Sequence, residues 1–221
     1  MRSCRTKPST VQAELACGVA AGPLFVTSFA SIGARRAGYD WRRHAVSSLA
    51  AGRGGWLQRA NFIFTGSLYC MAGHGLARAA HSRVLPALVS GAGGGLIGSG
   101  VFVTDPVAGF PPSSGAHDQA SVPPTREGTL HNLCAIPIFA GIPVAAVASA
   151  TSAARRGDHR WAAYSAGSAV AMMITSALFG AAFGGEPRLA AYGGVLQRVS
   201  ITAGFGWLSV LSVRALTSAR A

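Results

Sequence analysis

Apolar residues along this chain form long runs that are separated by short charged segments. Residues 15–34, 84–104, 128–154 and 161–185 contain no Asp, Glu, Lys or Arg. Each run reaches or exceeds the roughly 20 residues that an α-helix needs to cross the hydrocarbon of a bilayer. Two weaker segments carry one Arg near their start, Arg59 and Arg198. The number and spacing of these runs predict an all-α integral membrane protein.

The pattern predicts about six transmembrane helices in a single membrane domain at residues 12–213. Residues 1–11 and 214–221 are then short tails outside this domain, and two longer loops lie between spans. The expected spans are 12–33, 57–77, 84–104, 131–151, 161–183 and 190–213.

The distribution of charge indicates the orientation. Only 12% of the residues are charged, against about 25% in a soluble domain, although the net charge is +12. Most Arg residues lie between apolar runs, and no nucleic-acid-binding motif accompanies them, so we expect no nucleic acid partner. We expect the protein to lie in the inner membrane of the cell. The positive-inside rule then places both termini in the cytoplasm. Loops 34–56 and 105–130 then face outward.

The first of these outer loops contains Trp41, Val46 and Leu49, whose spacing suggests an interfacial helix that lies on the membrane.

Polar residues that are costly inside a membrane gather near the expected outer boundary. They come from distant parts of the sequence, but the predicted spans place them at a similar depth. Each has a structural interpretation: an Arg can reach lipid headgroups, and Asp105 before Pro106 can shape a turn. Together they predict a polar binding site. The candidate residues are Ser47, Gln58, Arg59, Asn61, Asp105, His131, Asn132, Gln197 and Arg198.

A short sequence also occurs twice. Residues 55–59 read Gly-Trp-Leu-Gln-Arg and residues 194–198 read Gly-Val-Leu-Gln-Arg. Both copies open spans that run inward from the outer face in the predicted topology. The repetition suggests a shared role for Arg59 and Arg198.

Four segments of the sequence resemble a known family. They are His44–Leu49, Gly55–Phe62, Gly100–Pro106 and Leu130–Asn132. As a series they are similar to the domain-of-unknown-function 998 family of prokaryotic multi-pass membrane proteins, over roughly residues 15–213. The resemblance implies a bacterial membrane protein and assigns no activity. The family's characteristic positions fall on Ser47, Arg59, Asp105, His131 and Arg198.

Three classes of function remain open. In the first, the polar site binds an anionic lipid headgroup or a small solute, with the guanidinium groups of Arg59 and Arg198 on phosphate or carboxylate. In the second, the protein is a metal-dependent hydrolase of lipid amides or esters, in which His44, Asp105 and His131, with His117 as a further candidate, hold zinc and leave one position for water. In the third, it is an accessory or scaffolding protein. Membrane lipids are the expected partners.

Overall fold

The computed structural model describes residues 8–79, 83–112 and 123–219, and within these ranges the chain is helical without a β-sheet. The all-α fold class predicted from the sequence is confirmed. The helices are α1 (Pro8–Ala34), α2 (Trp56–Ala79), α3 (Val84–Val101), α4 (Arg126–Phe139), α5 (Gly141–Arg155), α6 (His159–Phe183) and α7 (Gly193–Ser218), with one 3-10 turn, η1 (Ser47–Ala50).

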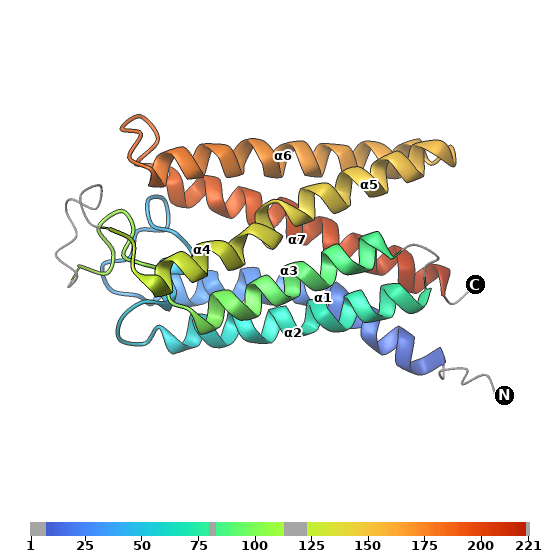
Figure 1. Ribbon diagram of the computed structural model, residues 1–221, viewed down its shortest axis with the longest axis horizontal. Coiled ribbons are helices and arrows are strands. Elements are labelled where there is room, and N and C mark those ends of the chain that lie inside the picture. The colour runs from blue at the N-terminus through green and yellow to red at the C-terminus, as the bar shows by residue number, and fades with distance from the viewer. Residues whose placement is uncertain (1–7, 80–82, 113–122, 220–221) are drawn as a thin grey trace.

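The helices run along the long axis of an elongated bundle (Figure 1). Helix α1 begins and α7 ends at the same end, which we call the terminal end. The segments that follow α1, α3 and α6 gather at the opposite end, which we call the loop end. The start of α1 and the end of α7 lie at the same end of the bundle because the number of helical segments that run its length, within the described residues, is even.

Five of these segments, in the described part of the chain, are long and apolar enough to cross a membrane: α1, α3, α4 with α5, α6 and α7. Helix α2 has a similar length but is more polar, because it contains Gln58, Arg59, Asn61, His74 and Arg78. It packs chiefly against α1 and α3. The protein is therefore a membrane-embedded helical bundle in which α2 packs between α1 and α3.

The span expected at 131–151 consists of two helices that meet at Ala140. Pro137 lies inside α4 and Pro143 near the start of α5. Proline lacks an N–H group and its ring displaces the carbonyl four residues earlier, so both prolines weaken the helix, although Ala140 still donates to the carbonyl of Ile136 at 2.9 Å. As a result α5 packs along α6, whereas α4 diverges from α6 toward the loop end (Figure 1).

Glycine allows α2 to approach α3 closely and α1 to approach α7 closely. A Cβ atom on Gly66 of α2 would lie 2.5 Å from the carbonyl oxygen of Gly93 on α3. A Cβ atom on Gly22 of α1 would lie 2.8 Å from the carbonyl oxygen of Phe205 on α7. Small residues at such contacts are the usual means of helix association in membranes, where helices gain little from the hydrophobic effect.

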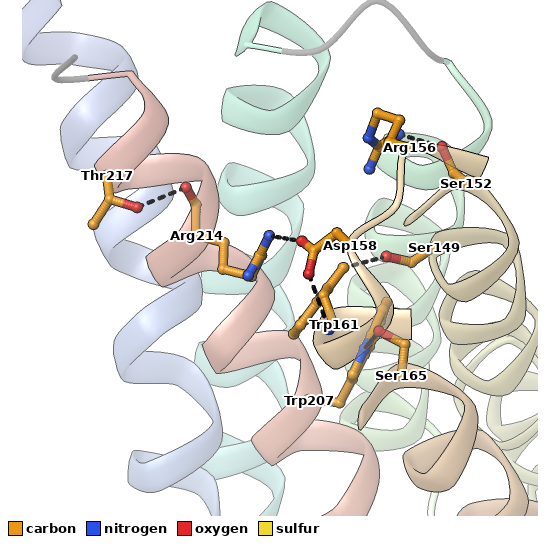
Figure 2. A network of polar contacts seen from close by, with 9 residues as sticks. All are labelled: Ser149, Ser152, Arg156, Asp158, Trp161, Ser165, Trp207, Arg214 and Thr217. Carbon is orange, nitrogen blue, oxygen red and sulfur yellow. Dashed lines mark hydrogen bonds and ion pairs between the residues drawn. The ribbon is translucent and has the colours of Figure 1, made fainter. Parts of the chain in front are cut away.

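At the terminal end, a polar network joins α5, α6 and α7 (Figure 2). The Nε1 atom of Trp161 donates to Ser149 Oγ at 2.9 Å, and that of Trp207 donates to Ser165 Oγ at 3.0 Å. The two indole rings stack with centroids 6.2 Å apart. Each buried indole N–H therefore has a partner, which such groups require inside a protein.

Two charged residues complete this network. The carboxylate of Asp158 accepts from the backbone N–H of Trp161 and caps α6, and it pairs with the guanidinium of Arg214 at 2.5 Å. Arg214 also lies 4.7 Å above the Trp161 ring. The backbone N–H of Trp161 lowers the pKa of Asp158, and Arg214 lowers it further.

The first loop differs from the prediction of an interfacial helix. Its only helical part is the short turn η1, and Val46 and Leu49 are buried in the core, whereas Trp41 is exposed. The two aliphatic side chains point into the bundle because the loop folds over the helix ends. The first loop, residues 35–55, thus covers the loop end of the bundle, and we call it the roof.

Candidate functional site

A cavity of about 730 Å³ lies under this roof at the loop end. This volume is within the range of small-molecule sites, roughly 300–1,000 Å³. Aromatic and aliphatic side chains line its deeper part, among them Phe25, Phe62, Leu96, Ile138, Phe179 and Phe205. Polar side chains line the part near the roof: Ser47, Ser99, Thr104, Asp105, Thr125, His131, Asn132 and Gln197.

Five of the nine predicted site residues line this cavity: Ser47, Asp105, His131, Asn132 and Gln197. They reach it from the first loop, the segment after α3, α4 and α7. The other four, Gln58, Arg59, Asn61 and Arg198, do not line it. Three polar lining residues, Ser99, Thr104 and Thr125, were missed. Ser99 lies in α3, where small hydroxyl residues are common in membrane helices, and Thr104 and Thr125 lie in the segment between α3 and α4, so the sequence gives little signal for them.

The carboxylate of Asp105 holds Thr125, the N-cap residue of α4. Its oxygens accept from the backbone N–H of Thr125 at 3.0 Å and from the Thr125 hydroxyl at 2.6 Å, and that hydroxyl accepts from the N–H of Gly128. A Cβ atom on Gly128 would collide with the carboxylate. A negative charge at a helix N-terminus is stabilised by the helix dipole. Asp105 therefore shapes the wall of the cavity.

His131 joins α4 to the end of α3. Its Nδ1 atom lies 2.9 Å from the carbonyl oxygen of Phe102, and since a carbonyl can only accept, the ring donates this hydrogen bond. The side chain is 5% exposed and its ring contacts Phe62. The imidazole thus fixes the width of the cavity between the two helices.

Some polar groups at the cavity have hydrogen-bonding capacity to spare. The hydroxyl of Ser99 is 2% exposed and has no partner among the described residues. A buried polar atom left without a partner costs about 1–3 kcal/mol. Gln197 uses its Oε1 atom to accept from the backbone N–H of Val46 at 2.7 Å. The amide of Asn132 is exposed and lines the cavity.

Arg59 binds the end of α3, and its copy Arg198 binds the roof. The Nε of Arg59 donates to the carbonyl of Gly100 at 3.0 Å. The guanidinium of Arg198 donates to the carbonyls of Gly194 and His44 at 2.9 and 3.2 Å, and to the hydroxyl of Tyr39 at 2.6 Å. Both arginines are therefore used to hold backbone at the loop end.

The glycines of the repeated sequence have a matching role. A Cβ atom on Gly55 would collide with the carbonyl oxygen of Ala50. A Cβ atom on Gly194 would lie 2.5 Å from the carbonyl oxygens of Trp41 and His44. Both glycines thus let the first loop lie directly on a helix start, whereas the two arginines differ, since Arg59 binds the end of α3 and Arg198 binds the first loop.

Gln58 and Asn61 connect α2 to α1 away from the cavity. The Nδ2 atom of Asn61 donates to the carbonyl of Phe25 at 3.2 Å and lies 3.3 Å from the Oε1 atom of Gln58. Gln58 is fully buried, and its Nε2 atom has no partner within the described ranges. These two amides contribute to helix pairing.

The structure does not assemble the predicted zinc ligands. The residues that it describes contain no group of three or more His, Cys, Asp and Glu that could hold a metal ion. The His44 Nδ1 atom accepts from the backbone N–H of Asp40 at 2.9 Å, and its ring packs against Phe110. Asp105 accepts hydrogen bonds from Thr125, and His131 donates one to the carbonyl of Phe102. His117 lies outside the described residues.

His44 is neutral at pH 7. Burial lowers its pKa below the ordinary value of 6.5, and the nearby charge of Arg43 lowers it further. Its ring packs with Tyr39 and Phe110 beneath the Arg-rich loop. The ring is thus an aromatic component of the roof.

Comparison with known protein families shows to which family the chain belongs. The model of the family described as "Protein of unknown function (DUF998)" matches residues 19–214. The chain belongs to this family. The resemblance found in the sequence is thereby confirmed. Within this DUF998 protein the match includes the cavity and its roof. No curated protein and no solved structure matches the chain.

Proposed function

We propose that this DUF998 protein binds an amphiphilic lipid in the cavity at its loop end, at the outer face of a bacterial inner membrane. The polar head lies near Ser99 and Asn132, and the apolar chain lies against Phe62 and Phe205. The observation that carries the proposal is the two-part lining of the cavity. The polar part includes a buried Ser99 hydroxyl that has no partner within the described chain.

The arrangement of the helices supports access from the side. The roof is tied down by Arg198 and Gln197, and the terminal end is filled by the stacked Trp161 and Trp207. Between α4 and α6, in contrast, contacts are sparse. The ring of Phe139 meets that of Phe179 there, with centroids 5.0 Å apart. Rotation of these rings opens a path from the bilayer.

The test is to measure lipid retained by protein purified in a mild detergent, by native mass spectrometry. Ala135 lines the cavity, so Ala135→Trp fills it and is expected to reduce the bound lipid by at least about tenfold, equivalent to about 1.4 kcal/mol. Leu133 is exposed on the same helix and does not line the cavity. Leu133→Trp is therefore the matched control and should retain the lipid. A wild-type protein that retains no lipid, or equal retention by Ala135→Trp, would refute the proposal.

A further inference from the structure

The electrostatics of the cavity restrict the head of its ligand. In the part of the chain that the structure describes, no Lys or Arg lines the cavity, and Asp105 is the only carboxylate that does. An anionic head would lose its hydration without gaining a positive partner, and it would lie near the charge of Asp105. Burying an unpaired charge in this way is strongly unfavourable.

The two arginines that the sequence predicted for the site do not change this balance. Arg198 directs its guanidinium to Tyr39 and to the backbone of the roof, and Arg59 directs its own to the end of α3. A cationic head is not favoured either. The carboxylate of Asp105 already accepts two hydrogen bonds from Thr125 and lies at the N-terminus of α4, which compensates its charge.

The groups that remain are neutral. The hydroxyl of Ser99 and the amide of Asn132 together supply both donors and acceptors. A head that carries hydroxyl or amide groups satisfies them without introducing charge. When the Ser99 side chain rotates its hydroxyl toward the cavity, binding also removes the cost of leaving that hydroxyl buried without a partner.

The size of the cavity restricts the apolar part. A molecule of liquid water occupies roughly 30 Å³. At this volume for each non-hydrogen atom, the cavity of about 730 Å³ holds on the order of two dozen non-hydrogen atoms. A glycerol-sized head and one acyl chain fit within this number, and a second chain of equal length does not.

We propose that the ligand is a single-chain amphiphile with an uncharged, hydroxyl- or amide-bearing head. This inference rests on the proposed function, because it specifies the class of lipid that the same cavity binds.

The experiment compares five probes on delipidated protein in a non-ionic detergent, with bound mass and affinity measured by native mass spectrometry. Four probes vary head charge and chain number independently: monooleoylglycerol, lysophosphatidylglycerol, dioleoylglycerol and dioleoylphosphatidylglycerol. Oleylamine tests a cationic head. We expect one monooleoylglycerol per chain, bound at least about tenfold more tightly than each of the other four.

Two variants connect the preference to named residues. Ser99→Ala should weaken monooleoylglycerol binding by about five- to tenfold, the usual effect of losing one hydrogen bond. Ser67→Ala, on the exposed face of α2, is its control. Asn132→Arg adds a positive charge at an exposed lining position, so it should strengthen lysophosphatidylglycerol binding and reverse the order of the two single-chain lipids.

The outcomes separate this inference from the proposed function. If none of the five probes binds, the lipid-binding function itself fails. If an anionic, cationic or two-chain probe binds most tightly to the wild-type protein, the function stands and the inference about ligand class is overturned. If Asn132→Arg leaves the order of the two single-chain lipids unchanged, the assignment of the head to this end of the cavity is wrong.

Discussion

The two ends of the bundle use similar residues in opposite ways. At the terminal end, the rings of Trp161 and Trp207 stack, and each indole N–H donates to a serine hydroxyl. At the loop end, aromatic rings and small polar side chains surround a cavity, and the hydroxyl of Ser99 has no partner among the described residues. A filled end stabilises the fold, whereas an end with free polar groups can bind a ligand.

The divergence of α4 from α6 explains the difference. Helix α5 stays against α6, so side chains at the terminal end meet across a short distance. The break at Ala140, between Pro137 and Pro143, lets α4 take a separate course. Space that side chains would otherwise fill is left open at the loop end. Changes at the two ends should therefore affect different properties.

The largest expected effect is at the terminal end. Trp207 is fully buried, so Trp207→Ala should lower the free energy of unfolding by about 3–5 kcal/mol and leave the Ser165 hydroxyl without its partner. Chemical denaturation in detergent measures the change. Trp56 is 67% exposed, and Trp56→Ala should have little effect. Equal losses in the two variants would show that the stack does not stabilise this end.

A smaller effect is expected at the roof. Gly194→Ala places a methyl group against the carbonyls of Trp41 and His44, and such overpacking costs about 1–3 kcal/mol. Hydrogen exchange of residues 39–50 should accelerate, because the loop must lift. Gly206 lies on the same helix with open space around its Cβ position, so Gly206→Ala is the control. Unchanged exchange in Gly194→Ala would mean that the roof is not held there.

The cap on α4 should contribute less. Asp105→Ala removes the two hydrogen bonds that hold Thr125, the N-cap residue of α4, but leaves the bond from Gly128 N–H to Thr125, so the cost should stay within the range of about 0.5–2 kcal/mol for a helix cap. Thermal unfolding measures the loss, and hydrogen exchange should locate it in the first turn of α4. Protection lost throughout the bundle instead would contradict a local capping role.

The smallest expected effect is the pH dependence of the Asp158–Arg214 pair. The pKa of Asp158 is lowered in the folded protein, so its contribution is complete above the ordinary pKa near 3.8 and is lost as the pH falls through the lower folded value. Both side chains are partly exposed, which limits the effect. Wild type and Asp158→Asn should differ in melting temperature at pH 6, and the difference should shrink as the pH falls below 3.8. A constant difference would exclude this linkage.

The sequence carried more information about the helices than about the cavity. Charge-free runs located the helices because a lipid-embedded backbone tolerates few charges. Asp105 and His131 were found because charged and ionisable residues are rare at that depth. Ser99 is one small residue among many in α3, and only the course of α4 turns its surroundings into a cavity.

The roles of the arginines could not be read from the sequence either. Arg59 and Arg198 suggested anion binding, but their partners are carbonyl groups from α3 and from the first loop. Such contacts depend on how the loop folds, and the residue pattern does not specify this. The error of an interfacial helix at Val46 and Leu49 has the same origin.

The polarity of α2 has a consequence for how the protein enters the membrane during synthesis. A helix that carries Gln58, Arg59 and Asn61 gains less by entering the bilayer alone than the five more apolar segments do. Helix α3 follows directly in the chain and packs closely on α2 through Gly66 and Gly93. The two helices therefore enter the bilayer most favourably as a preformed hairpin.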